Sequence, residues 1–185
     1  FVWDKASKHM TDLGSFGGWY SHPNWINDNG DVVGISSYAD NTRRAFYWHN
    51  NMLQDLGTID TDDRSVAVGV NNVGLIVGYP FDNGGNEIRG FISDNGGALV
   101  DINTLIDKPH GLYVAAAYYI NDRDEIVGFA YTKKGEIHPV VLIPESDSDP
   151  SADTGPDAIQ KEHLPAKRIQ LCKKGRMFAR FCATR

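Results

Sequence analysis

Three irregular segments of the chain together offer aromatic rings and charged side chains: residues 16–22, 60–64 and 107–113. Aromatic planes pack on sugar rings or on peptide side chains, and carboxylates and arginine supply directional hydrogen bonds. We therefore expect these segments to form a binding surface for a sugar or a peptide; the alternative is a polar rim with ordinary exposed aromatic residues. The candidate binding residues here are Trp19, Tyr20, His22, Asp62, Arg64, His110 and Tyr113.

Catalytic motifs are missing from the sequence. The nucleophile elbow G-x-S-x-G, the zinc motif H-E-x-x-H and the phosphate-binding glycine motifs do not occur. The six histidines fall at different offsets in the repeats described below, which argues against a shared ligand set. A carboxylate pair for glycoside hydrolysis remains an open alternative. We expect no catalytic residue, no metal and no cofactor.

Many acidic residues lie in turns, where Asp and Asn serve the backbone. Residues 27–31 resemble a calcium loop, but the bidentate acid is missing and the corresponding residues 71–75 contain no acid, so we expect a turn. Asp12, Asp55 and Asp101 occupy matching positions and could form a ring of acids. We favour the other interpretation, in which each caps a strand end by bonding its own backbone.

A hairpin motif organises these segments, and it occurs in residues 25–34, 69–78 and 119–128. Each copy is an apolar run, a polar turn and a second apolar run ending in Gly, which is typical of a β-hairpin. Phe1, Phe46 and Phe91 recur every 45 residues, a period found in four-stranded propeller blades. In the second unit we expect strands at residues 45–48, 52–56, 65–70 and 75–79.

The pattern predicts an all-β domain over residues 1–143, built as three propeller-type blades of four antiparallel strands; a β-solenoid ranks second. One extra strand, residues 138–143, follows the third unit. Known propellers use about 4–8 blades, so three blades cannot close a ring. The remaining blades belong to a preceding part, or copies of the chain associate, or a partner covers the open edges. Because the chain starts at Phe1, we expect a processed or excised piece.

In each unit we call the strand that contains Phe46, Phe91 or the corresponding Val140 the Phe-type strand. A basic residue recurs two positions before these residues, at Arg44, Arg89 and His138. In a propeller we expect these positions near the inner mouth of the channel, where they could hold an anion or a carboxylated ligand. Salt bridges to Asp residues of neighbouring blades are the interpretation we favour.

Charge is unevenly distributed along the 185 residues. Residues 1–150 hold 10 Lys+Arg against 21 Asp+Glu, a net charge of −11, whereas residues 151–185 hold 8 against 3, a net charge of +5. Phosphates would be repelled by the repeats, which argues against nucleic-acid binding. The sequence also lacks a run of about 18 apolar residues, so we expect no transmembrane segment.

The C-terminal part divides into a flexible linker, residues 144–163, and a basic apolar arm, residues 164–185. We expect the arm to dock on a protein surface, either of this chain or of a partner, because its apolar side chains need burial. These side chains are Ile169, Leu171, Phe178 and Phe181. Cys172 and Cys182 either join in a disulfide, as we expect for an exported protein, or remain two reduced thiols.

Three phrases, residues 10–18, 26–34 and 44–48, resemble the HAF family of extracellular repeat proteins. The resemblance covers residues 1–143. The His-Ala-Phe triplet that names the family reads Arg44-Ala45-Phe46 here, then Arg89-Gly90-Phe91, then a degraded His138-Pro139-Val140. The resemblance implies a propeller-like fold and export from a bacterial cell, to an extracellular or periplasmic place. It implies no reaction, because the family carries no agreed activity.

Two functions follow as expectations. The first is a non-catalytic repeat module that acts in protein–protein interaction or as a structural or accessory subunit of an assembly, with a protein partner or self-association. The second is a propeller that binds or processes carbohydrate, with a glycan as its ligand.

Overall fold

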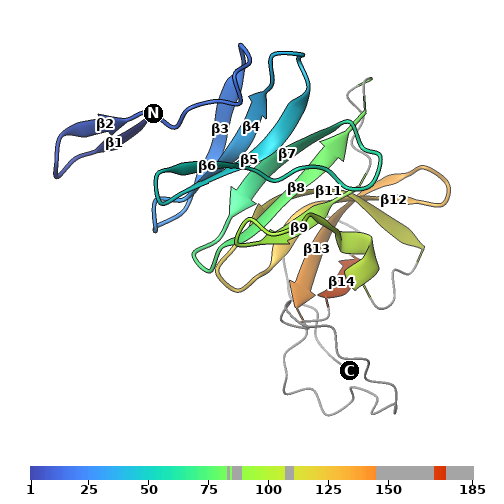
Figure 1. The fold of residues 1–185 in the computed structure, drawn as a ribbon. Coiled ribbons are helices and arrows are strands. Elements are labelled where there is room, and N and C mark those ends of the chain that lie inside the picture. The colour runs from blue at the N-terminus through green and yellow to red at the C-terminus, as the bar shows by residue number, and fades with distance from the viewer. Residues whose placement is uncertain (83, 85–88, 107–110, 145–168, 174–185) are drawn as a thin grey trace, which may run out of the picture.

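The computed structural model describes residues 1–82, 84, 89–106, 111–144 and 169–173 (Figure 1). Across these residues the regular structure is β-strand, apart from the short 3-10 helix η1 (Ile102–Leu105). Every strand pairing is antiparallel. The prediction of an all-β fold with four-stranded antiparallel sheets is confirmed.

Three four-stranded sheets form the body of the molecule, and in each the strands lie side by side in chain order. The first sheet contains β3 (Ser21–Ile26), β4 (Val32–Ser37), β5 (Arg43–His49) and β6 (Met52–Asp55). The second contains β7 (Arg64–Val70), β8 (Leu75–Phe81), β9 (Phe91–Asp94) and β10 (Val100–Asp101). The third contains β11 (Leu112–Ile120), β12 (Ile126–Thr132), β13 (Ile137–Pro144) and β14 (Ile169–Lys173).

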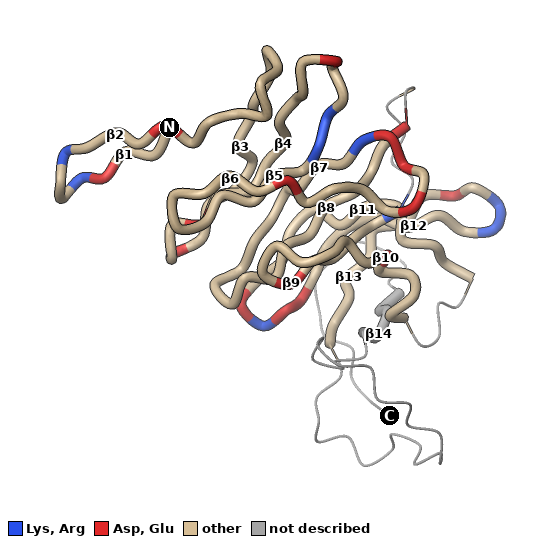
Figure 2. The backbone as a smooth tube through the Cα atoms, in the orientation of Figure 1, with Lys and Arg blue, Asp and Glu red and all other residues tan. Residues whose placement is uncertain are grey.

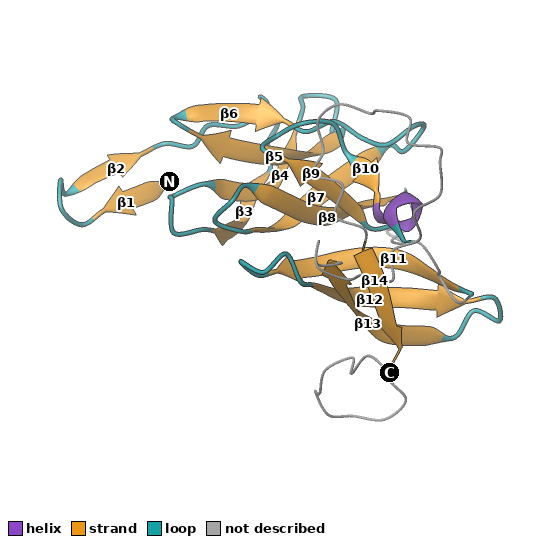
Figure 3. Cartoon of the chain, turned by 90° about the horizontal axis from the view of Figure 1, so that it is seen from below, coloured by secondary structure: helices purple, strands orange, loops and turns teal. Residues whose placement is uncertain are grey.

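A separate hairpin precedes the sheets. It pairs β1 (Val2–Asp4) with β2 (His9–Thr11) and extends away from the rest of the molecule (Figures 1 and 3). Figure 3 also separates the third sheet from the first two. The blade-like sheets are thus arranged one after another and do not close on themselves.

Each sheet is offset from the repeat expected from the sequence. A sheet takes the last two strands of one 45-residue unit and the first two of the next. Residues 38–42 connect β4 to β5 within the first sheet, and residues 56–63 lead from β6 to the second sheet. The Phe-type strands β5, β9 and β13 are therefore third in their sheets.

The third sheet is completed by the C-terminal arm. The extra strand expected at residues 138–143 is β13, and β14 pairs with it in the register Leu142 to Leu171. Residues 169–173 of the predicted arm therefore form the fourth strand of this chain's own third sheet. Most of the predicted linker, Phe178, Phe181 and the predicted Cys172–Cys182 disulfide lie outside the part of the chain that the structure describes.

The glycine that ends each hairpin motif permits close packing within a sheet. Gly34 lies opposite Phe46, and Gly78 lies opposite Phe91. A Cβ atom on Gly78 would lie 2.1 Å from the carbonyl oxygen of Val66 and 2.5 Å from the Phe91 ring. The first strand of each sheet is bulged near this point, which brings its backbone over the glycine. Only glycine fits, and the phenylalanine ring fills the space.

Apolar side chains form separate cores between neighbouring sheets. Val33 and Tyr47 of the first sheet pack with Val70 and Ile76 of the second. Equivalent residues of the second and third sheets form the next core, which includes Val77, Ile92, Val114 and Ile120. Burial of these side chains is the main force that holds one sheet against the next.

A polar ladder joins the turns at one end of the sheets. The side-chain amide of Asn72 donates to Asp28 in the first sheet at 2.8 Å and to Asp122 in the third sheet at 2.9 Å. Residues 27–31, 71–75 and 121–125 thus connect all three sheets, and the turn interpretation of residues 27–31 is confirmed. We call these three turns the turn rim.

The strand-end acids are caps. Asp12, Asp55 and Asp101 each accept a hydrogen bond from a backbone N–H two residues later, at 2.7–2.9 Å. The interpretation as Asx-type caps is confirmed. Asp55 also accepts a bond from the Tyr38 hydroxyl at 2.7 Å, and this bond, with burial, raises the pKa of Tyr38.

Candidate functional site

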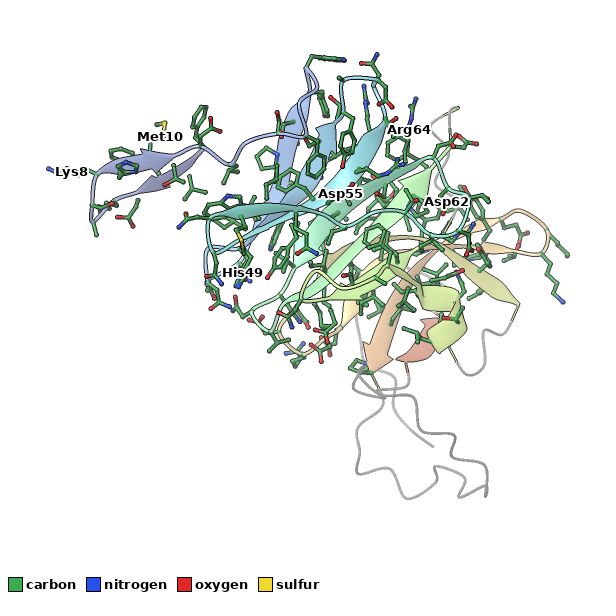
Figure 4. The ribbon with its side chains drawn as sticks, viewed as in Figure 1. Lys8, Met10, His49, Asp55, Asp62 and Arg64 are labelled. Carbon is green, nitrogen blue, oxygen red and sulfur yellow. The ribbon has the colours of Figure 1, made fainter. Side chains whose placement is uncertain are left out.

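Connections between sheets, and some connections within them, gather at the end opposite the turn rim. This loop rim comprises residues 16–22, 38–44, 60–64, 89–90 and 111–113. Figure 4 shows Asp62 and Arg64 together at this end and His49 on the far side. The described residues of the three irregular segments, 16–22, 60–64 and 111–113, lie together on this rim, as expected. His110 lies outside the described residues.

Trp19, Tyr20 and His22 form an aromatic group at the start of the first sheet. The Tyr20 ring stacks on His22 at 6.3 Å between centroids, and the Trp19 indole donates to Asn41 at 2.7 Å. The guanidinium of Arg43 lies 4.8 Å from the centre of the Tyr20 ring. Such a cation–π contact holds the tyrosine plane in place. Sequence reasoning missed Arg43, because only its neighbour Arg44 falls at a repeated position.

A polar hollow of about 310 Å³ lies beside this group. Arg44 donates to the backbone carbonyl of Asp63 at its edge. The hollow is lined by Asp40, Asn41, Thr42, Arg44, Asp62, Asp63 and Arg64. Three predicted binding residues, Arg44, Asp62 and Arg64, therefore line the same hollow.

A second hollow, of about 420 Å³, lies between the first and second sheets. Its lining is more aromatic: Tyr20, His22, Asn24, Ile35, Val66, Val68, Tyr79 and Phe81. Arg64 covers Phe81 at 5.9 Å and so stands between the two hollows. Sequence reasoning missed Tyr79 and Phe81, because they follow the repeated glycine and read as ordinary strand residues.

Arg89 is held by two carboxylates of the preceding connection. Its guanidinium lies 3.2 Å from Asp60 and 3.1 Å from Asp62. Burial raises the pKa of Asp62, and Arg89 opposes that rise. Burial lowers the pKa of Arg89, but the nearby carboxylates, Asp62 first, raise it overall. The favoured interpretation of this repeated basic position, a salt bridge to acids of a neighbouring unit, is confirmed for Arg89.

Tyr113 is part of the same electrostatic group. Burial, then the charge of Asp101, raises the pKa of its hydroxyl, while Arg89 lowers it. The hydroxyl is therefore a neutral donor at physiological pH. Inside the described residues, one carboxylate oxygen of Asp62 and the Nε of Arg89 are buried without a hydrogen-bond partner.

The three repeated basic residues differ in their surroundings. Arg44 donates to a backbone carbonyl and Arg89 to two carboxylates, whereas His138 of β13 lies 3.8 Å from Glu136, in the turn just before that strand. The structure therefore brings Arg44 and Arg89 onto the loop rim with Asp62 but leaves His138 with a separate partner.

The described residues contain no cluster of three or more metal-ligating side chains, and no described helix has the length and apolarity to cross a membrane. Figure 2 shows that most of the described acids lie in loops and turns. The loop rim therefore offers aromatic planes and hydrogen-bonding groups in shallow hollows, an arrangement suited to binding.

A different surface appears at the two ends of the row of sheets. Ile26, Val70 and Ile120 occupy the same position on the first strand of each sheet. Val70 and Ile120 are 1% and 8% exposed because each faces the preceding sheet, whereas Ile26 is 52% exposed. We call the surface around Ile26 the N-terminal end face.

The opposite end is exposed in the same way. Val127 aligns with Val33 and Val77, which are fully buried against the next sheet, yet Val127 is 40% exposed. Its cross-strand neighbour Val141, also 40% exposed, aligns with Tyr47 and Ile92 at 3% and 9%. We call the surface around Val127 and Val141 the C-terminal end face. Sequence reasoning missed both faces, because these residues follow the same pattern as buried ones.

Comparisons of the chain with protein-family models, with curated proteins and with solved structures found no match.

Proposed function

We propose that this chain is a non-catalytic repeat module that binds protein through the open end faces of its row of sheets. The observation that carries the proposal is the exposure of Ile26, Val127 and Val141 at positions that are buried wherever one sheet meets another. Apolar surface of this kind is stabilised when a partner covers it. Export to an extracellular or periplasmic place is part of the proposal and is supported by the family resemblance alone.

A photo-cross-linking amino acid at Val127 tests the proposal in the cell that makes the protein. A protein partner on the C-terminal end face should give a discrete protein adduct. The matched control places the cross-linker at Lys134, which is exposed on the connection between β12 and β13 of the same sheet. Equal adduct formation at both positions, or none at Val127, would overturn the proposal.

Carbohydrate binding is the second candidate, and the aromatic hollow near Tyr20 supports it. Tyr20, Tyr79 and Phe81 line a space of about 420 Å³, which is within the size range of ligand pockets. A glycan array with the wild-type chain and the Tyr20→Ala variant tests this function. Binding that Tyr20→Ala abolishes would favour it, and an array without any bound glycan would exclude it for the glycans displayed.

A further inference from the structure

We propose that the two end faces are complementary halves of one joint, through which a second copy of this chain docks head to tail. The inference rests on the proposed function, since it requires the end faces to bind protein and then names that protein. The argument uses the two joints that the chain already makes between its own sheets.

The apolar part of each internal joint uses equivalent positions, which hold large apolar residues in both joints. In the first joint, Val33 and Tyr47 of one sheet meet Val70 of the next. The C-terminal end face presents Val127 and Val141 at the positions of Val33 and Tyr47. The N-terminal end face presents Ile26 at the position of Val70. A second copy therefore supplies the residue type that each exposed face lacks.

One hydrogen bond of the polar part also repeats in both joints. The side-chain amide of Asn27 donates to the carbonyl of Asn71 at 2.9 Å, and that of Asn71 donates to the carbonyl of Asn121 at 3.2 Å. The Asn71 carbonyl also accepts a bond from Gly74 within its own turn. Within the described residues, the Asn27 carbonyl has only the corresponding bond, from Gly30. The first turn thus retains the acceptor that a preceding turn would use.

The third turn retains the matching donor. The side-chain amide of Asn121 donates to Glu125 of its own turn at 2.7 Å, just as that of Asn27 donates to Asp31 at 2.9 Å. The Asn27 amide also reaches the next turn, whereas among the described residues the Asn121 amide makes no bond to another turn. In a head-to-tail joint this amide reaches the Asn27 carbonyl of the second copy. The bond from Asn121 to Glu125 and the ion pair of Glu125 with Arg123 are both retained in that joint.

One position makes the joint between copies weaker than the internal joints. Asn72 lies between Asp28 and Asp122 and donates to both, so each internal joint pairs one amide with one carboxylate. Between copies the same register places Asp122 beside Asp28. Two carboxylates repel each other, so this contact opposes association and salt relieves it. Association is therefore reversible and depends on ionic strength.

The shape of the chain permits this contact. The β1–β2 hairpin extends away from the first sheet and leaves Ile26 exposed (Figure 1). The contact joins unlike surfaces, so it is heterologous and closes into a ring when the rotation allows. Two copies supply six sheets, within the range of about 4–8 blades found in closed propellers.

Sedimentation velocity on the purified full chain tests the proposal up to about 1 mM, a range that detects weak binding. The wild type should show concentration-dependent association that strengthens with salt. Asp122→Asn restores the amide–carboxylate pair and should lower the dissociation constant about tenfold or more, with little salt dependence. Val127→Lys and Ile26→Lys should each weaken association about tenfold or more, because each places a charge in the joint. Circular dichroism confirms that each variant is folded.

Mixing the two lysine variants identifies the geometry. Each retains one intact end face, so the mixture should form dimers of one Val127→Lys chain with one Ile26→Lys chain at concentrations where neither variant associates alone. A monomeric wild type, an unchanged dissociation constant in Asp122→Asn, or a mixture that stays monomeric overturns the proposal. If the Val127 cross-link in cells then joins a different protein, the proposed function stands and only the second copy is excluded.

Discussion

The indole of Trp25, on the first strand of the first sheet, lies edge-on against the phenol ring of Tyr119, on the first strand of the third sheet. The ring centres are 5.6 Å apart and the planes meet at 69°. Gly69 occupies the same position on the intervening strand, β7. The absence of a side chain at Gly69 lets the outer two sheets touch across the middle one.

The first prediction concerns this aromatic contact. Edge-to-face aromatic pairs contribute about 0.5–1.5 kcal/mol beyond the area they bury. A double-mutant cycle with Trp25→Ala and Tyr119→Ala, measured by urea unfolding, should give a coupling energy in that range. In the control cycle Tyr131→Ala replaces Tyr119→Ala, and its effect with Trp25→Ala should be additive within about 0.5 kcal/mol. Additivity in both cycles would show that the contact is energetically neutral.

Gly78→Ala should strongly destabilise the second sheet. The added Cβ would lie 2.1 Å from a backbone oxygen, which the bulge in β7 holds in place. Overpacking of this kind costs about 1–3 kcal/mol or more, and denaturant unfolding measures the loss. Gly69→Ala is the matched control, because its Cβ meets nothing closer than 3.3 Å. Equal losses for both variants would contradict the backbone contact as the cause.

Asn72→Asp should destabilise the protein more than Asn72→Ala. The aspartate would lie between Asp28 and Asp122 and replace two hydrogen bonds with two like-charge contacts. Loss of the bonds alone, in Asn72→Ala, should cost about 1–3 kcal/mol. The extra loss in Asn72→Asp should shrink at high salt, which screens the repulsion. Val73→Asp controls for added charge on the exposed neighbouring position and should have little effect.

The pH dependence of stability should reveal the burial of Asp62. Its pKa is raised in the folded state, so the native protein binds a proton more tightly there than the unfolded chain does. This contribution is full below the ordinary Asp pKa and is lost as pH rises through the raised value. Asp62→Asn should remove that decline, so the difference in unfolding free energy between variant and wild type should change with pH in this window. The same substitution at Asp60, which is largely exposed, should leave the pH profile close to that of the wild type.

Much of the fold follows from local residue choice. The Asn-containing turns, the apolar alternation and the glycine opposite Phe46 or Phe91 specify hairpins, because turn geometry and side-chain period act over a few residues. The caps at Asp12, Asp55 and Asp101 follow for the same reason. Sequence reasoning also placed Trp19, Tyr20, Arg44 and Asp62 on one rim, because equivalent loops of a repeat lie at the same end.

The grouping of strands into sheets was decided in three dimensions. A 45-residue period has no intrinsic start, so the repeat alone does not say which four consecutive strands share a sheet. β14 is a second example, since no repeat pattern marks residues 169–173 as the strand beside β13. Residues far apart in sequence pair when a free sheet edge is available.

The sequence by itself determined the hairpins, their caps and the identity of the repeating core, because these depend on neighbours within one unit. Only the tertiary structure decided that Ile26, Val127 and Val141 are exposed while their equivalents are buried. The sequence pattern is the same at all three repeats, and burial depends on whether another sheet lies against that position. The ends of the row therefore differ from its interior in environment and not in residue type.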